Sequence, residues 1–181
     1  MNHSENGGER SGSPPVGNQA DQVLVTREIA LDFLAINGLM EQLTHQEREM
    51  YVRIAMAYQL NPFKRELHVS LWGEGDARRF SCIVGYEVYI KRAERTGKLN
   101  GWKVSTEGDG EGMKAVLEVY RKDWTHPFKH EVYWKEAAQK KRDGSITGFW
   151  SKMPRFQLKK VAISQGFRLA FPDELGGLPY E

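Results

Sequence analysis

The chain has 181 residues, enough for one domain with a sizeable core and too few for two full domains. Hydrophobic residues make up 40%, charged residues 28%, and the mean hydropathy is -0.60, which is typical of a globular protein. No apolar run approaches the ~18 residues that a membrane span needs, and the N-terminus lacks the apolar stretch of a signal peptide. Cys82 is the only cysteine, which excludes an intrachain disulfide. These features predict a cytoplasmic protein.

The formal net charge of +2 hides an uneven distribution along the chain. Residues 1–50 contain three basic and eight acidic side chains, a net charge of −5. Residues 121–168 contain twelve basic and four acidic side chains, a net charge of +8. This asymmetry predicts a polyanion partner for the second half, or head-to-tail contact between the acidic and basic ends of neighbouring copies.

A tail and two helices are predicted in the first third of the chain. Residues 1–22 are rich in Gly, Ser, Asn and Pro and have too few large apolar side chains to offset chain entropy, so we expect a disordered tail. Residues 24–36 show helical spacing, with Thr26 as a possible cap. A capping box from Thr44 to Glu47 then opens a second helix that runs to Leu60.

Beyond Pro62 the apolar period changes to two. Two strands with turn residues between them predict an antiparallel hairpin, a helix follows, and three more strands surround an acidic, glycine-rich turn. The expected ranges are 66–72 and 79–85 for the hairpin, 86–95 for the helix, 102–105, 114–120 and 129–134 for the strands, and 107–112 for the turn. Residues 137–148 form a polar, basic connection. This order predicts one α+β domain over residues 23–181, with a mostly antiparallel β-sheet packed with helices.

The last helix is bracketed by Pro154, a plausible first residue, and by Pro172, which predicts a length of about 17 residues. It has two apolar faces, which suggests a helix that packs against other parts of the protein on both sides. One face holds Leu158, Val161, Ala162, Gln165 and Leu169, and the other holds Phe156, Ile163 and Phe167.

Basic residues on this helix do not form one stripe. Arg155 and Lys159 share a flank with Gly166, where the missing side chain would let a bulky partner approach the backbone. Lys160 and Arg168 point elsewhere. A core helix with solvated cations is the alternative interpretation.

The sequence gives little support to nucleotide binding, metal binding or nuclease chemistry. The glycine-rich segments lack the GK[ST] of a phosphate-binding loop, so no nucleotide cofactor is expected. His126 and His130 lie around a proline and have no plausible second pair of metal ligands, so no metal is expected. A metal-dependent nuclease would need converging carboxylates, and most of the candidates fall on the predicted turn. These candidates are Asp109, Glu111, Glu118 and Asp123.

Nucleic-acid binding is better supported, because cations alternate with aromatic residues between Tyr120 and Lys152. Cations attract phosphates, and flat side chains can stack on unpaired bases for about 1–3 kcal/mol each. We expect Tyr120, Phe128 and Tyr133 to be core residues. Trp150, which lies between a glycine and a basic run, is expected to be exposed for stacking.

Five short blocks in chain order carry a more specific signal. They are Leu60-Asn61-Pro62-Phe63 with Glu66; Gly85-Tyr86 with Lys91-Arg92-Ala93-Glu94-Arg95; Tyr120-Arg121-Lys122-Asp123 with His126-Pro127; Trp150 with Pro154 and Leu158; and Arg168-Leu169-Ala170-Phe171. In these blocks the chain strongly resembles the RecT/Redβ (Bet) family of phage single-strand annealing proteins. The resemblance runs from about Thr44 to Tyr180.

The resemblance implies a non-enzymatic, ATP-independent protein that binds single-stranded DNA, anneals it to a complementary strand and assembles into rings or helical filaments. It implies as partners a phage exonuclease and the host single-strand binding protein, reached through a C-terminal region that we expect to be absent from a chain ending at Glu181. Some relatives carry a lysine where this chain has Val161. A metal-dependent nuclease and a non-catalytic protein-interaction module remain alternatives.

The basic site residues follow from the same resemblance, whereas Trp150 comes from the pattern of cations and aromatic residues, and the two phenylalanines come from the two apolar faces of the last helix. A groove lined by basic residues holds both strands in the family, and its candidates here are Lys64, Arg65, Arg121, Lys122, Trp150, Lys152, Arg155, Lys159, Lys160 and Arg168. Phe167, or Phe156 beside it, is expected to contribute to the contact between subunits.

Overall fold

The computed structural model describes residues 24–73 and 75–179. Its α-helices are α1 (Arg27–Ile36), α2 (His45–Ala57), α3 (Tyr86–Arg95), α4 (Trp134–Ala137), α5 (Gly148–Lys152), α6 (Pro154–Ala170) and α7 (Pro172–Leu175). Its strands are β1 (Leu67–Trp72), β2 (Arg79–Val84), β3 (Leu99–Glu107), β4 (Lys114–Arg121) and β5 (Phe128–Tyr133). Short 3₁₀ turns are η1 (Pro62–Lys64), η2 (Gly75–Ala77) and η3 (Gly110–Gly112). The tail predicted at residues 1–22 lies outside the described residues.

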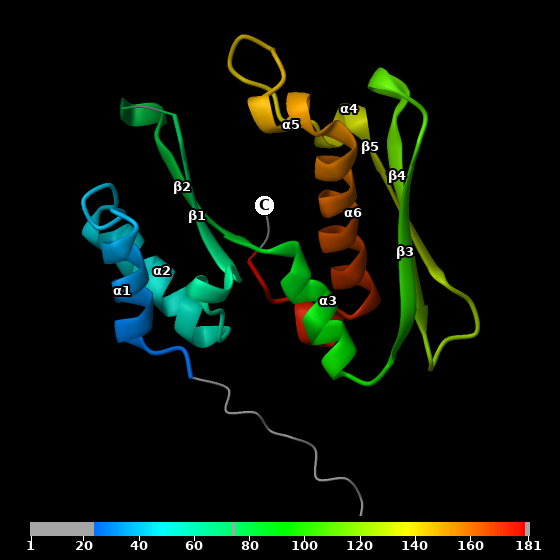
Figure 1. The fold of residues 1–181 in the computed structure, drawn as a ribbon, viewed down its shortest axis with the longest axis horizontal. Helices are drawn as coiled ribbons and strands as arrows, with labels where there is room; N and C mark the ends of the chain where they lie inside the picture. The colour runs from blue at the N-terminus through cyan, green and yellow to red at the C-terminus, as the bar shows by residue number, and fades with distance from the viewer. Residues whose placement is uncertain (1–23, 74, 180–181) are drawn as a thin grey trace, which may run out of the picture.

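The strands form two antiparallel sheets, a β1–β2 hairpin and a three-stranded sheet in the order β3-β4-β5. In Figure 1, α6 lies along one face of the three-stranded sheet, α3 lies beside α6, and α1 and α2 cover one side of the hairpin. The predicted α+β class, with antiparallel sheets packed against helices, is therefore confirmed. None of the helices within the two described ranges is long and apolar enough to cross a membrane.

The packing of α6 depends on Gly166. A Cβ atom at this position would overlap Leu117 Cδ2 of β4 and lie 3.3 Å from His130 Cβ of β5. Only a glycine lets the helix backbone come this close to the sheet without displacing the buried Leu117 side chain. The close approach expected at Gly166 is thus present, and the partner is the sheet of the same chain.

Both apolar faces of α6 are used within the chain, as its sequence suggested. Leu158 and Ala162 of one face are buried, and so are Ile163 and Phe167 of the other. The Phe167 ring meets the Trp102 ring edge-on, with centroids 5.9 Å apart, and stacks on Phe171 at 6.1 Å. The expectation that Phe167 lies at a subunit contact is wrong, because its side chain is fully buried in this core and presents no surface to a neighbouring copy.

Helix starts were predicted well because local hydrogen bonds decide them. Thr26 accepts a hydrogen bond from the Ile29 amide at the start of α1. Thr44 and Glu47 form the predicted capping box of α2. The α6 range matches the predicted length of 17 residues. By contrast, β3 is longer than expected, and α4, α5 and α7, each of four or five residues, are too short to show a helical period.

Glu47 also joins α2 to the hairpin, because its carboxylate binds the guanidinium of Arg78, just before β2. This contact, more than the capping bonds, lowers the pKa of Glu47 to about 2. Since the carboxylate is more acidic in the folded than in the unfolded chain, it stabilises the fold fully above pH ~4.5. The contribution is lost as the pH falls toward 2.

We therefore expect Glu47→Gln to lower the free energy of unfolding by about 1–2 kcal/mol at pH 7. The difference from the wild type should shrink when thermal or denaturant unfolding is repeated at pH 3, where part of the wild-type contribution is already gone. Glu41→Gln, at an exposed loop position, is the matched control and should have little effect. If Glu47→Gln lowered the free energy of unfolding by the same amount at both pH values, the ionised carboxylate would not be the source of the stabilisation.

Candidate nucleic-acid interface

The β1–β2 hairpin has one covered and one open face, because its side chains alternate. Leu67, Val84 and Cys82 are buried on the side that meets α2, where Cys82 lies near Tyr51. Trp72, which is 60% exposed, and Ile83 lie on the other side. The hairpin thus presents exposed apolar side chains away from α1 and α2.

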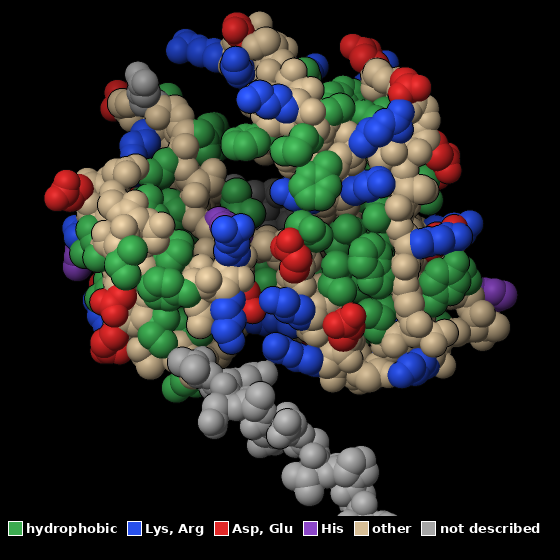
Figure 2. Space-filling model, in the orientation of Figure 1, with side chains coloured by type: hydrophobic (Ala, Val, Ile, Leu, Met, Phe, Trp, Pro, Cys, Tyr) green, Lys and Arg blue, Asp and Glu red, His purple; other side chains and the backbone are tan. Residues whose placement is uncertain are grey.

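Figure 2 shows that the molecule is hollowed between this open hairpin face and the α5–α6 side, a region we call the central hollow. Hydrophobic side chains border it over α5 and the first turns of α6, and lysine and arginine side chains gather between the hairpin base and α3. The exposed apolar residues on α5 and early α6 include Phe149, at 73%, and Phe156, at 44%. Cationic and flat apolar groups therefore occur together here, the combination that single-stranded nucleic acid requires.

The hairpin base and α3 are joined through Gly85. Its amide donates a hydrogen bond to the Glu66 carbonyl at 3.2 Å, and a Cβ atom here would lie 2.8 Å from the Arg65 carbonyl oxygen. Arg65 has a left-handed backbone conformation with φ 59°, which turns the chain from η1 into β1. Lys64 and Arg65, which are both exposed, therefore lie at this junction, beside the start of α3.

The first turns of α6 reach the same junction. The Phe156 ring meets the Tyr86 ring edge-on, with centroids 6.4 Å apart. Lys160 Nζ lies 4.7 Å from the Phe156 centroid and 5.7 Å from the Tyr86 centroid. The structure therefore brings together two segments that carry predicted site residues, around residues 64–65 and 156–160, and joins them through Gly85 and Tyr86.

Lys64, Arg65, Lys152 and Lys159 have no carboxylate partner in the part of the chain that the structure describes. Within residues 24–73 and 75–179, no carboxylate lies within ion-pair distance of any of these four side chains. Lys64, Arg65 and Lys152 are exposed and Lys159 is half-buried. Cations of this kind can bind phosphates without first giving up a carboxylate.

Arg155 is held in a different way, by the β3–β4 loop. Its guanidinium donates hydrogen bonds to Thr106 Oγ1 at 3.0 Å and to the Gly108 carbonyl at 3.3 Å, and it pairs with the carboxylate of Asp109. The Asp109 side chain is almost fully exposed, so the pair is solvated and weak. Arg155 can therefore exchange this carboxylate for a phosphate at little cost.

Arg121 and Arg168, both predicted DNA contacts, have hydrogen-bond partners within the chain. The Arg121 side chain is only 10% exposed, pairs with Asp123 and donates to the Ala170 carbonyl at the end of α6. Its guanidinium lies between the rings of Trp124 and Phe171, 4.4 and 4.7 Å from their centroids. Arg168 donates to the carbonyls of Leu178 and Gly176. Arg121 thus gives a donor to a carbonyl at the C-terminal end of α6, where carbonyls lack helix partners. Arg168 instead ties the segment that follows α7 to α6.

Lys122 lies at this same end, next to Arg121, and its side chain is exposed. The predicted cations therefore do not form one continuous row. Lys152, Arg155, Lys159 and Lys160 lie on α5 and the first half of α6, whereas Arg121, Lys122 and Arg168 lie near the other end of α6.

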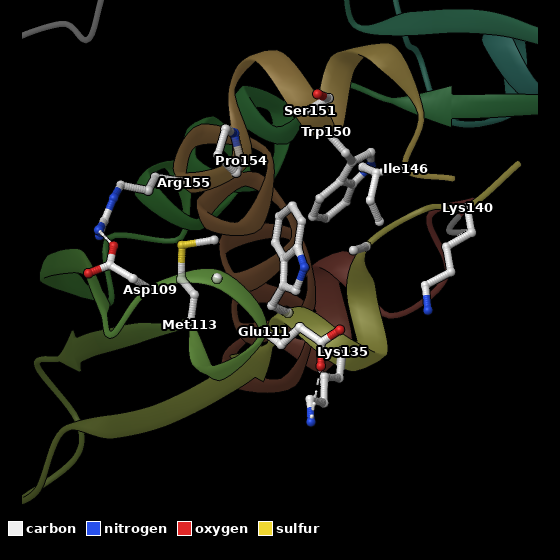
Figure 3. A pocket seen from close by; sticks show the side chains of 13 residues that line it. Asp109, Glu111, Met113, Lys135, Lys140, Ile146, Trp150, Ser151, Pro154 and Arg155 are labelled. Atoms are coloured by element: carbon white, nitrogen blue, oxygen red, sulfur yellow. Dashed lines mark hydrogen bonds and ion pairs between the residues drawn. The ribbon is translucent and has the colours of Figure 1, made fainter. Parts of the chain in front are cut away.

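Trp150 is not exposed as expected. Only 4% of its surface is accessible, and it meets the Trp134 ring edge-on with centroids 5.4 Å apart. The two tryptophans line a pocket of about 430 Å³ whose rim carries the Arg155–Asp109 and Lys135–Glu111 pairs (Figure 3). Its neighbour Phe149 is the exposed aromatic residue that the sequence analysis missed, since a five-residue helix gives no period from which its open side could be read.

The four carboxylates considered for a nuclease do not converge. Asp109 pairs with Arg155, Glu111 with Lys135, and Asp123 with Arg121. Glu118 binds Lys103 and Lys129 on the outer face of the sheet, and its pKa falls to about 2, first because Tyr120 donates a hydrogen bond to it and then because of Lys103. In the described part of the chain, no three potential metal ligands come together.

The outer face of the sheet, away from α6, balances its charges. Lys103 and Lys129 flank Glu118, and Glu107 and Glu131 flank Lys114. These three lysines and three glutamates alternate on neighbouring strands, so each cation has a carboxylate partner. The face therefore offers little net charge to a polyanion.

Comparison with known proteins agrees with this picture. The family model described as RecT family matches residues 27–181. A comparison with curated proteins found no match. Members of the RecT family are non-catalytic annealing proteins that act in recombination, so the predictions of family, of single-strand annealing and of a protein that is not an enzyme are confirmed. Since the match covers almost the entire described chain, the protein belongs to the RecT family.

Proposed function

We propose that this protein binds single-stranded DNA along the central hollow and anneals complementary strands without ATP, as an oligomer on the DNA. The observation that carries this proposal is the group of cations Lys64, Arg65, Lys152 and Lys159 on η1, α5 and α6, which have no ion-pair partner among the described residues. The exposed apolar side chains of Phe149 and Phe156 add surface on which unpaired bases can lie.

Annealing breaks no covalent bond, so the protein needs to supply only charge neutralisation and alignment. Two DNA strands repel each other as polyanions, and cations that bind their phosphates release counterions and remove much of that barrier. Phosphate contacts carry no sequence information, which suits a protein that must accept any pair of complementary strands. Base edges stay available for pairing because the cations contact the phosphate backbone.

Assembly into rings or filaments would repeat these contacts along a strand. Phe156 stays a proposed contributor to the subunit contact, since it is partly exposed at the edge of the core. The proposed setting is the cytoplasm of a phage-infected bacterium, with an exonuclease that exposes the single strand and the host single-strand binding protein as partners.

The direct test is strand annealing followed with a duplex-specific fluorescent dye, without nucleotide. We expect purified protein to accelerate pairing of complementary oligonucleotides and to leave non-complementary pairs unchanged, with rings or filaments in electron micrographs. A protein-interaction module would not retain DNA at low salt, and a nuclease would shorten the substrate with magnesium on a gel. Either result, without accelerated annealing, would refute the proposal.

Charge removal on the first half of α6 tests the proposed contacts. We expect Lys159→Ala and Arg155→Ala each to weaken single-stranded DNA binding several-fold on every sequence. Each should also reduce the slope of log K against log salt by about 0.7–1, the value of one lost phosphate contact. Lys103→Ala is the matched control, because this exposed lysine lies on the outer sheet face beside Glu118. Equal effects at Lys103 and Lys159 would argue against a localised site.

The Asp109 carboxylate should compete with DNA for Arg155. We expect Asp109→Asn to raise affinity by up to about fivefold, because an exposed ion pair contributes about 0.2–1 kcal/mol. Glu111→Gln removes the same charge from the same loop but leaves the Arg155 pair intact, so it should raise affinity less. Binding titrations at one fixed salt concentration compare the two variants. A larger gain from Glu111→Gln would contradict the competition.

A further inference from the structure

Lys160 is held by aromatic rings. Its ammonium nitrogen lies 4.7 Å from the centroid of Phe156 and 5.7 Å from that of Tyr86. Both distances are within the range in which a ring quadrupole attracts a cation. No carboxylate among the described residues is within ion-pair distance of Lys160.

This environment differs from that of the cations that pair with carboxylates. Lys91 pairs with Glu66, Arg121 with Asp123 and Arg155 with Asp109. A carboxylate cancels the charge of its partner, and a phosphate has to displace it. A neutral ring cancels no charge, so a phosphate can join the rings around Lys160 instead of replacing them.

The two rings are themselves fixed. Tyr86 is the first residue of α3 and follows Gly85, whose lack of a side chain holds it against the Arg65 carbonyl. Phe156 precedes Lys160 by one helical turn on α6 and meets the Tyr86 ring edge-on at 6.4 Å. The pair therefore bridges the two helices at the point where the hairpin base joins them.

An unrestrained lysine has a long, flexible stem, and ordering it on binding opposes affinity. The rings order this stem before any ligand arrives. We propose that Tyr86 and Phe156 are positioning residues that hold the Lys160 ammonium, at full charge, for a backbone phosphodiester of single-stranded DNA. The inference rests on the proposed function and adds to it a defined phosphate contact with its own support.

A double-mutant cycle tests the proposal. Binding of a fluorescent single-stranded oligonucleotide is measured by anisotropy over a range of salt concentrations for the wild type, Tyr86→Leu, Lys160→Met and the double variant. Lys160→Met should reduce the slope of log K against log salt by about 0.7. Tyr86→Leu should cost about two- to fivefold in affinity with the slope kept, since the lysine remains. In the Lys160→Met background, Tyr86→Leu should cause no further loss of affinity.

Three variants control the cycle. Tyr86→Phe keeps the ring and should restore wild-type binding. Lys159→Met, at the neighbouring lysine with no ring partner within the described residues, should combine additively with Tyr86→Leu. Phe156→Leu removes the other ring from a partly exposed position and should reproduce the coupling to Lys160, so it replaces Tyr86→Leu if thermal melts show that variant to be unfolded.

The ring contacts can also be observed without DNA. Ring currents should shift the Lys160 Hε resonances upfield in the wild type and in Tyr86→Phe, and less in Phe156→Leu. Unshifted resonances in the wild type would overturn the positioning role whatever the DNA result. Normal wild-type binding with additive effects at Tyr86 and Lys160 would overturn this inference and leave the proposed function standing. A wild type that binds no DNA would overturn both.

Discussion

The seating of α6 on the three-stranded sheet is the constraint on which the rest of the structure depends. Because Gly166 has no side chain, the helix backbone lies directly against Leu117 of β4, and Phe167 fills the space between Trp102 and Phe171. A helix anchored so closely along one half cannot rotate or slide without opening the core. Its first turns are thereby fixed beside α3, and with them Lys160 and its neighbours on the same helix.

The described cations discussed above differ in their partners. On the outer sheet face, and in arginines such as Arg121, the charge is matched by carboxylates or used to satisfy helix carbonyls. At the junction of η1, α3 and α6, Lys64 and Arg65 meet no described carboxylate, and Lys160 meets rings. The net charge of the whole chain is therefore a poor guide to binding, and the local balance is the relevant quantity.

Sequence reasoning succeeded where neighbours along the chain decide the structure. The Thr44–Glu47 capping box follows from local hydrogen bonds, and the range of α6 follows from the prolines at its two ends. It failed at Trp150, Phe167 and Arg121, because burial depends on partners such as Trp134, Trp102 and Ala170 that lie far away in the sequence. Phe156 and Phe167 were placed on one helical face, and only the tertiary fold shows that the sheet covers one of them and leaves the other partly open.

The charge-balanced outer sheet face gives the subunit two dissimilar sides. A strand bound as proposed would be attracted from the hollow alone and would have no electrostatic reason to wrap around the sheet. Copies arranged in a row would all have to turn the same side toward the DNA to share one strand. The lysines and glutamates that alternate across β3, β4 and β5 would then form an electrostatically neutral outer surface. Such a surface would not attract a second layer of nucleic acid to the outside of the assembly.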